Sequence, residues 1–481
     1  MTIRFLARVL LCASPMLAVA GGLHAQSETD LPPLSATDEQ VGRLVEMRVT
    51  NEAVGGYHDV LMDLRMQQVV NGLLGPSRLE APRPHFLILD SPVPNVFGAP
   101  YETLFITRGM LEQLRDDDEL AVVLAHAIGH QAAGHDRWSP GLRARLAAIR
   151  VSDALLGPGF ASATEEPLSF QGLGLRFLLR AYTPAEERTA DSIAATLFAG
   201  SPYAARTGAG VLEALARDEA RDLFPAFART HPAYPGRAER LAAAPPPSGA
   251  PRAIRLTLPL DSTLLGFIAG ERGFLGFVAG GAYYRVREPA RIGLPPLWTA
   301  RMLGGYLSAT SPAAHAVLVL RGVAAEGAEG LAQQYQDIPG GARRIAPLAF
   351  QIDRKPVFWW QDALPGGGTR IVAFFETTGV GWQITGIADA AGVQELQQAV
   401  QWMIREARAP MPGETPPQPR LALLAVQRAA TLRELAAPFA REDVPIAAIA
   451  RLNRLDSGAV VPAGTRLRIP VVASVADESQ R

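Results

Sequence analysis

An apolar helix that carries two histidines four residues apart is the feature that most restricts how this chain can fold. The apolar run at 120–125 leads into His126, and His130 follows. At about 100° per residue the two imidazoles project from one face of a helix predicted over 117–135, so they can bind one metal ion. The chain has eight histidines, however, and core or surface histidines also occur at this spacing by chance. The meaning of the pair therefore depends on residues elsewhere in the chain.

Two carboxylates downstream favour a metal site. Glu187 and Asp191 lie four residues apart, so they share one face of a second helix. Glu187 offers a third ligand atom, and Asp191 offers an acceptor for the second ring N–H of a zinc-bound histidine. The sequence thus predicts one Zn²⁺ ion bound by His126, His130 and Glu187, with Asp191 orienting a ligand.

The pattern around these helices indicates a mostly helical unit with a small sheet. Residues 38–74 show helical periodicity, 84–90 indicate a short buried strand, and 103–107 a second strand. Residues 95–97 lie between the two strands and are placed to run along the edge of the sheet. A helix over 108–115 precedes the histidine helix, and the chain beyond it is predicted to form helices joined by loops.

Four motifs in this region resemble the zinc metallopeptidases of the CAAX prenyl protease and heat-shock membrane protease type, peptidase family M48, and in particular their soluble periplasmic branch. The resemblance spans roughly 36–244. The family pattern has an Asn-x-Phe edge segment, Leu-Ala-x-x-Leu-Ala-His-Glu-x-Gly-His, Glu-x-x-Ala-Asp and Thr-His-Pro. It is matched in order by Asn95-Val96-Phe97, residues 120–130, residues 187–191 and Thr230-His231-Pro232.

The resemblance implies a role for each matched residue. It makes His126, His130 and Glu187 the zinc ligands, and it places His231 near the metal or the transition-state oxyanion. Edge-strand addition is a general way of binding an extended peptide. The substrate-binding residues expected on this basis are Asn95, Val96, Phe97 and Arg237, the last of which matches the arginine that follows the final motif.

The chain departs from the family pattern at one position. In the family a glutamate follows the first histidine, takes a proton from the attacking water and later delivers it to the leaving amine, and here that position is Ala127. General acid–base catalysis contributes about 10²–10⁴-fold to a rate. We therefore expect weak or absent peptide hydrolysis, with some activity left because zinc alone still polarises a carbonyl and lowers the pKa of water. A zinc site without its base could also hold two helices together, or bind polypeptides without cutting them.

No nearby residue is an evident replacement for the missing base. Glu119 lies about 10 Å from His126 along the helix axis, and Glu186 should point away from the metal. His135 is predicted to lie on the opposite face of the same helix. Glu102 is left as a remote alternative.

The N-terminus indicates export. Residues 1–25 contain Arg4 and Arg8, then an apolar run, then a small-residue ending, as in a secretory signal peptide. We expect a periplasmic protein without membrane-spanning segments, and without disulfides because Cys12 is the only cysteine. A formal net charge of −1 gives no strong field to recruit nucleic acid.

Two proline-rich stretches, at 245–251 and 410–419, divide the mature chain into blocks over 26–244, 252–409 and 420–481. The expected fold class is a multidomain α+β protein. Its first block is a mostly helical zincin-type peptidase domain with a small edge sheet. The middle block is a small α+β domain, with strands at 316–320, 370–376 and 381–388 and a helix at 392–408.

The last block resembles a degenerate LysM module, a βααβ unit that in other proteins binds the N-acetylglucosamine chains of peptidoglycan. The resemblance rests on residues 431–436, 452–455 and 462–470, while Ala429-Ala430 replace the usual Gly-Asp. Glycan binding and a purely structural role are both consistent with this pattern. Taken together, the blocks indicate envelope protein quality control, with unfolded or outer-membrane polypeptides as partners.

Overall fold

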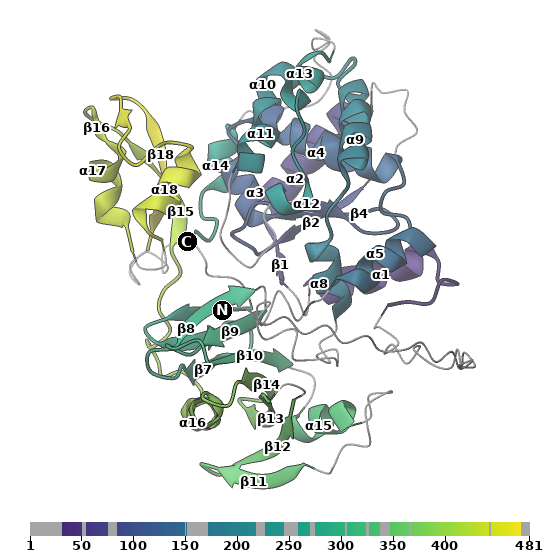
Figure 1. Ribbon diagram of the computed structural model, residues 1–481. Coiled ribbons are helices and arrows are strands. Elements are labelled where there is room, and N and C mark those ends of the chain that lie inside the picture. Colours follow the sequence, from purple (N-terminus) through teal and green to yellow (C-terminus); the bar gives the residue numbers. More distant parts are fainter. Residues whose placement is uncertain are drawn as a thin grey trace, which may run out of the picture.

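The computed structural model describes thirteen stretches of the chain: 31–50, 54–75, 84–149, 151, 172–217, 227–244, 258–269, 275–303, 305–323, 327–336, 347–364, 367–441 and 444–472. The predicted signal peptide at 1–25 lies outside the described residues. Within the described part, no helix is long and apolar enough to cross a membrane. The structure is mixed α+β, with helices gathered toward the N-terminus and strands toward the C-terminus (Figure 1).

The first helical stretch is two helices rather than one. Helix α1 (Asp38–Arg48) and helix α2 (Val60–Leu74) are separated by strand β1 (Gly56–Tyr57). Gly55 has a φ of +95°, a conformation that glycine adopts readily and that a right-handed helix does not allow. The helical periodicity predicted over 38–74 therefore belongs to two elements.

The small sheet has the strand order β1-β2-β4-β3. Strand β2 (His85–Leu89) is parallel to β4 (Thr103–Thr107), and β3 (Val96–Gly98) is antiparallel to β4. Strand β3 pairs Val96 with Ile106 and Phe97 with Phe105. It lies at the edge of the sheet, as expected for residues 95–97, and the two segments predicted as strands form the neighbouring strands β2 and β4.

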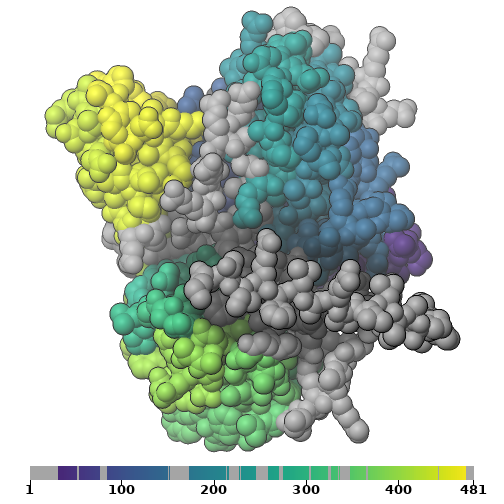
Figure 2. Space-filling view, in the orientation of Figure 1, coloured from purple at the N-terminus to yellow at the C-terminus, as the bar shows by residue number. Residues whose placement is uncertain are grey.

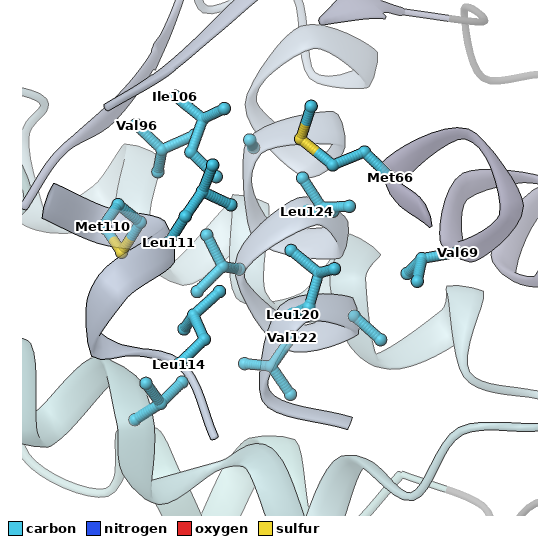
Figure 3. Close-up of a cluster of buried hydrophobic side chains, with 14 of the residues drawn as sticks. Met66, Val69, Val96, Ile106, Met110, Leu111, Leu114, Leu120, Val122 and Leu124 are labelled. Atoms are coloured by element: carbon cyan, nitrogen blue, oxygen red, sulfur yellow. The ribbon is translucent and has the colours of Figure 1, made fainter. Parts of the chain in front are cut away.

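Helices pack on this sheet and form the first unit. Their bounds are α3 (Arg108–Gln113), α4 (Asp117–Ala132), α5 (Pro140–Ala148), α8 (Gly172–Leu179), α9 (Pro184–Leu197), α10 (Ala205–Gly208), α11 (Gly210–Arg217), α12 (Phe227–Thr230) and α13 (Arg237–Ala242). Figure 3 shows α4 in the centre of the core, where Leu120 and Leu124 lie among side chains from α2, α3, β3 and β4. Burying one leucine contributes about 1.5–3 kcal/mol, so this core fixes α4 firmly.

Helix α4 ends three residues earlier than the sequence predicted. It stops at Ala132, and Gly134 takes a φ of +73°. The His135 N–H donates to the carbonyl of His130 and the Gly134 N–H to that of Gln131, at 3.1 and 2.9 Å, which is the Schellman arrangement of a helix C-terminus. The turn reverses the chain, and His135 consequently returns toward His130 instead of continuing on the opposite face.

The middle unit is rich in β-structure. Its three-stranded sheet, in the order β5-β6-β7, and its seven-stranded sheet, in the order β11-β12-β13-β14-β10-β9-β8, are accompanied by two helices. The predicted strands and helix of this block appear as β10, β13, β14 and α16. The bounds are β5 (Gly276–Ala279), β6 (Ala282–Arg285), β7 (Ala290–Gly293), β8 (Thr299–Leu303), β9 (Tyr306–Thr310), β10 (Ala316–Val323), α15 (Ala328–Gln336), β11 (Leu348–Ile352), β12 (Lys355–Ala363), β13 (Thr369–Thr377), β14 (Val380–Ala388) and α16 (Val393–Glu406).

The C-terminal unit places two helices between paired outer strands. Strand β15 (Arg420–Ala425) is antiparallel to β18 (Arg466–Val471), and the two-residue strands β16 (Ala430–Thr431) and β17 (Val460–Val461) pair beside them. Between lie α17 (Leu432–Ala436), the short 3₁₀-helix η2 (Ala437–Phe439) and α18 (Ile446–Asn453). In chain order the described elements of this block are thus β15, β16, α17, η2, α18, β17 and β18.

The C-terminal unit is docked on the helical unit, and Figure 2 shows it as a yellow lobe beside the blue and teal residues. Arg468 bonds to Asp261 through Nε at 2.8 Å and also donates to the carbonyls of Glu112 and Leu114. Arg454 pairs with Glu119 at 2.8 Å. The start of the histidine helix is therefore held by the C-terminal unit.

The segment between the first two blocks belongs to the same junction. Helix α14 (Leu260–Leu264) buries Leu260 and Leu264 in the core that also contains α2 and α4. Arg65 of α2 donates to the hydroxyl of Thr263 at 3.1 Å. Residues 260–264 thus pack with the helical unit, although the proline-rich stretch before them suggested a boundary.

Candidate metal centre

Helices α4 and α9 carry the functional side chains, and their ends are defined by local capping. Asp116 accepts hydrogen bonds from the N–H groups of Asp118 and Glu119, at 3.0 and 2.9 Å, at the start of α4. Thr183 and Glu186 form a reciprocal capping box at the start of α9, with Pro184 as its first residue. Both helices therefore begin where the sequence supplies side chains for their unpaired N–H groups.

Gly129 lets α4 and α9 approach closely. A Cβ atom at this position would lie 2.3 Å from the carbonyl oxygen of Ala190, which is closer than any side chain tolerates. The contact lies beside His130 on α4 and between Glu187 and Asp191 on α9. Close approach at Gly129 is thus what brings the predicted ligands of the two helices together.

Four donor residues converge between these helices. His126, His130, Glu187 and His231 each offer one ligand atom, all of these atoms lie within 4.8 Å of one another, and all four residues are buried. Nε2 of His126 lies 3.2 Å from Nε2 of His130 and 3.7 Å from Oε2 of Glu187. Nε2 of His130 lies 3.2 Å from Oε1 of Glu187.

These separations suit zinc. Ligand atoms about 2.0–2.2 Å from a tetrahedral Zn²⁺ ion lie roughly 3.3–3.5 Å from one another. The three measured separations scatter around that value, and the donor set of imidazole nitrogens and one carboxylate is typical of zinc. The residues present therefore fit the metal that their types suggest.

The carboxylate of Glu187 has little else to bind. Its side chain is fully buried, and within the described part of the chain neither carboxylate oxygen has a hydrogen bond. Nη2 of Arg237 lies 3.0 Å from Oε2, a favourable ion-pair distance without hydrogen-bond geometry. Burial raises the pKa of Glu187 to about 8, although Arg237 opposes the rise. A buried carboxylate whose oxygens accept no hydrogen bond from the described residues indicates a position that a positive charge stabilises, and Arg237 supplies one such charge beside Oε2.

The carboxylate of Asp191, unlike that of Glu187, has several polar partners. Its Oδ1 lies 2.7 Å from Nδ1 of His126, and its Oδ2 accepts the Tyr234 hydroxyl at 2.7 Å and faces Nε of Arg237 at 2.9 Å. Burial tends to raise the pKa of Asp191, but these neighbours outweigh it and hold the pKa at about 2. Asp191 is therefore ionised and positioned to keep the proton of His126 on Nδ1, which leaves Nε2 unprotonated. Nη2 of Arg237 lies 3.2 Å from this Nε2.

His130 is oriented by His135, which the turn after α4 brings close to it. Nδ1 of His135 lies 2.9 Å from Nδ1 of His130, so the prediction that His135 faces away was wrong. The signal for this contact was Gly134, a glycine placed to end a helix. Burial lowers the pKa values of His126, His130 and His231, so the three imidazoles are neutral, as metal ligands must be.

His231 completes the donor group from a third element. It directly follows α12, its ring stacks on Phe227 with centroids 4.3 Å apart, and its Nδ1 lies 2.9 Å from the Thr230 hydroxyl. Its ring centroid lies 5.3 Å from that of His126. These contacts fix the orientation of the His231 ring beside the other donors.

Ala127 is buried beside the ligands, and the acidic residues considered as replacements lie outside the donor group. Glu119 pairs with Arg454 of the C-terminal unit, and Glu186 pairs with Arg145 at 2.9 Å. Glu102 is exposed in the turn before β4. The structure therefore brings none of these three carboxylates into the donor group.

The residues expected to bind substrate are also buried. Asn95, Val96 and Phe97 are at most 3% exposed, with β3 at the sheet edge. Arg237 is 1% exposed and faces the carboxylates of Glu187 and Asp191. The structure thus directs Arg237 to the donor group and its supporting carboxylate.

The family of the region that carries the donor group follows from a match to known protein families. Residues 61–244, less than half of the 481-residue chain, match the family model of peptidase family M48. These residues form a peptidase family M48 domain. The M48 domain contains all four donor residues, and M48 peptidases are zinc enzymes, so the resemblance inferred from the motifs is confirmed for this segment.

Curated proteins and solved structures add little to this family match. No curated protein matches the chain. A crystal structure from Bacteroides thetaiotaomicron VPI-5482 is 14% identical, covers 28% of this chain and 50% of its own, and has a TM-score of 0.21. This chain therefore spans half the length of that protein, at a score too low to establish a shared fold.

Two residues of the M48 domain were missed in the sequence. Tyr234 supports Asp191, and Tyr182 places its ring over His130 with centroids 3.7 Å apart. Neither residue lies in a helix. Their positions depend on the loops around α9 and α12, for which the sequence carries no periodic signal.

Proposed function

We propose that this protein binds one zinc ion through His126, His130 and Glu187 and engages polypeptides at that site with weak or no hydrolysis. The observation that carries the proposal is the Glu187 carboxylate, which is buried, accepts no hydrogen bond from the described residues and lies 3.2 Å from Nε2 of His130. His231 is the candidate for a fourth position, near the metal or the developing oxyanion.

The protein's own residues account for binding better than for proton transfer. Asp191 holds the tautomer of His126, and His135 orients His130. Zinc, when bound, would polarise a peptide carbonyl and lower the pKa of water. Ala127 can neither accept a proton nor return it to the leaving amine. The missing step corresponds to about 10²–10⁴-fold in rate, or roughly 3–5 kcal/mol of barrier.

The proposed setting is the periplasm, reached through the signal peptide at 1–25. Unfolded or outer-membrane polypeptides are the proposed clients, and envelope protein quality control is the proposed role. The M48 domain and its buried donor group support a metal-dependent function in handling polypeptides.

The test compares three forms of the full chain: wild type, Ala127→Glu and Ala127→Gln. Bound zinc is measured by mass spectrometry, and digestion of casein is followed with and without chelator. We expect about one zinc per chain in all three and chelator-sensitive digestion that rises about 10²–10⁴-fold in the glutamate variant alone. Absence of zinc from all three forms would overturn the ligand assignment. An equal rate in the glutamate and glutamine variants would overturn the role assigned to position 127.

A second candidate function, attachment to peptidoglycan, is favoured by the C-terminal unit. Its β15, α17, α18 and β18 follow the element order of the LysM module. The full chain should then sediment with purified peptidoglycan, and soluble N-acetylglucosamine oligomers should release it. Sedimentation that the oligomers leave unchanged would reject glycan recognition. The intact chain is used because Leu421 and Leu452 belong to the core of the first unit.

A further inference from the structure

Strand β3 turns two backbone N–H groups away from its partner strand. Toward β4, the carbonyl of Asn95 accepts from Thr107 at 3.0 Å, and the N–H of Ala99 donates to Thr103 at 3.0 Å. Alternate residues of an edge strand point their backbone groups outward. The N–H groups of Val96 and Gly98 therefore face the free edge of the sheet, where an added polypeptide strand would pair.

Both outward N–H groups already have partners within this chain. The Val96 N–H donates to Oδ1 of Asn95 at 2.8 Å, and the same oxygen accepts the Thr230 hydroxyl at 3.0 Å. The Gly98 N–H donates to the Tyr182 hydroxyl at 3.4 Å. The edge that would receive a substrate is thus filled by side chains from two later parts of the sequence.

Tyr182 connects the edge strand to the metal helix. Its ring lies over His130, its hydroxyl donates to Asp136 at 2.8 Å, and its backbone N–H donates to the Thr230 carbonyl at 2.8 Å. Arg180 also donates to the Tyr182 hydroxyl, at 2.5 Å, and to Asp136. Tyr182 is 3% exposed, so it covers one side of the donor group.

The side chains that cover the edge of β3 pack closely against Gly98. A Cβ atom there would lie 2.0 Å from Oδ2 of Asp136, so only glycine allows Asp136 to approach the strand this far. Within the described residues, this Oδ2 has no hydrogen-bond partner. Asp136 is therefore held at β3 by the Tyr182 hydroxyl and by Arg180, and loss of the hydroxyl would weaken the closure.

We propose that Tyr182 is a latch that holds the substrate edge of β3 closed, so that an extended polypeptide pairs with Val96 and Gly98 only after residues 180–183 move away. This rests on the proposed function, because it concerns how polypeptides reach that same site. A polypeptide that binds the open form alone has its affinity reduced by the fraction of molecules that are open. The latch is thus a regulatory element that limits access to the metal centre.

The experiment compares wild type with Tyr182→Phe, which keeps the ring and removes the hydroxyl. Amide hydrogen exchange is measured at Gly98, with Phe105, paired with Phe97 inside the sheet, as an internal reference for unfolding. Hydrogen exchange is measured in the presence of a chelator, so that bound zinc does not affect it. Tyr283→Phe is the matched control, since it removes another buried hydroxyl, which donates to the Leu275 carbonyl at 3.2 Å in the middle unit. Binding of fluorescein-labelled casein is followed by anisotropy.

We expect Gly98 to exchange about tenfold faster in Tyr182→Phe, with Phe105 unchanged, and casein to bind about tenfold more tightly. This corresponds to about 1.4 kcal/mol, the scale of one or two net hydrogen bonds. Unchanged exchange at Gly98, or equal acceleration at Gly98 and Phe105, would overturn the latch. If Gly98 exchanges faster in Tyr182→Phe but wild type and variant bind casein equally tightly, Tyr182 does not control how polypeptides reach the edge of β3. Faster exchange with no casein binding in any form would support the latch and reject the proposed function instead.

Discussion

The protonation of Glu187 should make the zinc-free protein less stable as the pH rises. The pKa of this carboxyl is about 8 in the folded protein, because burial favours the neutral form, against 4.5 for an ordinary glutamate. Between these values the folded state retains a proton that the unfolded state has lost. Stability from this group is therefore full below pH 4.5 and declines until pH 8.

The size of the effect follows from the shift. Over the whole range the change is about 3.5 pKa units, or roughly 5 kcal/mol at 1.36 kcal/mol per unit. The histidines act in the opposite direction below their ordinary pKa of 6.5, since burial lowers their folded pKa values. The interval from pH 6.5 to 8 isolates Glu187 best, and there the expected loss is about 2 kcal/mol.

The perturbation is Glu187→Gln, which is neutral at every pH and nearly the same size. Urea unfolding with excess EDTA should show wild type losing about 2 kcal/mol between pH 6.5 and 8, while the variant changes little. Glu186→Gln is the matched control, because its neighbours, Thr183 and Arg145, lower the pKa of Glu186 despite its burial, so its contribution is constant in this interval. Zinc should remove the decline in wild type, since the metal replaces the proton.

Parallel curves for wild type and Glu187→Gln between pH 6.5 and 8 would refute the reasoning. They would mean that Glu187 is ionised without metal and is stabilised by Arg237 more strongly than burial penalises it. A decline of the same size in Glu186→Gln and Glu187→Gln would assign the effect to other groups.

Three further predictions concern how the donor group is assembled. Gly129→Ala should lower the free energy of unfolding by roughly 2 kcal/mol in urea titrations, because its Cβ would meet the Ala190 carbonyl at 2.3 Å. Asp191→Asn should weaken zinc binding about 10–100-fold in competition with a chelating dye, since the neutral amide orients His126 less strongly. Arg468→Ala should destabilise the docked C-terminal unit by about 2 kcal/mol and expose it to limited proteolysis, and an unchanged digestion pattern would count against that docking role.

Where residue spacing alone sets the geometry, the predictions from the sequence agree with the structure. Strand β4 has the predicted bounds, and β2 and β3 lie where the apolar runs indicated. His126 and His130 share a helix face because i and i+4 positions always do. Glu187 and Asp191 do so for the same reason, and the ordered motifs identified the family.

Other contacts are set by the tertiary structure and do not follow from the spacing of residues along a helix or strand. His135 meets His130 because a glycine turn reverses the chain, and Tyr182 and Thr230 reach β3 from distant segments. The C-terminal unit holds α4 through Arg454, some 335 positions away from Glu119 in the chain.

The sequence by itself determined which residues are available for zinc binding and that Ala127 lacks the general base. Only the folded protein decided that Glu187 is buried beside Arg237 and the ligand histidines, and that the edge of β3 is closed by its own chain. The physical reason is that side-chain identity and helical spacing are local properties, whereas burial, pKa and access depend on which distant segments pack together.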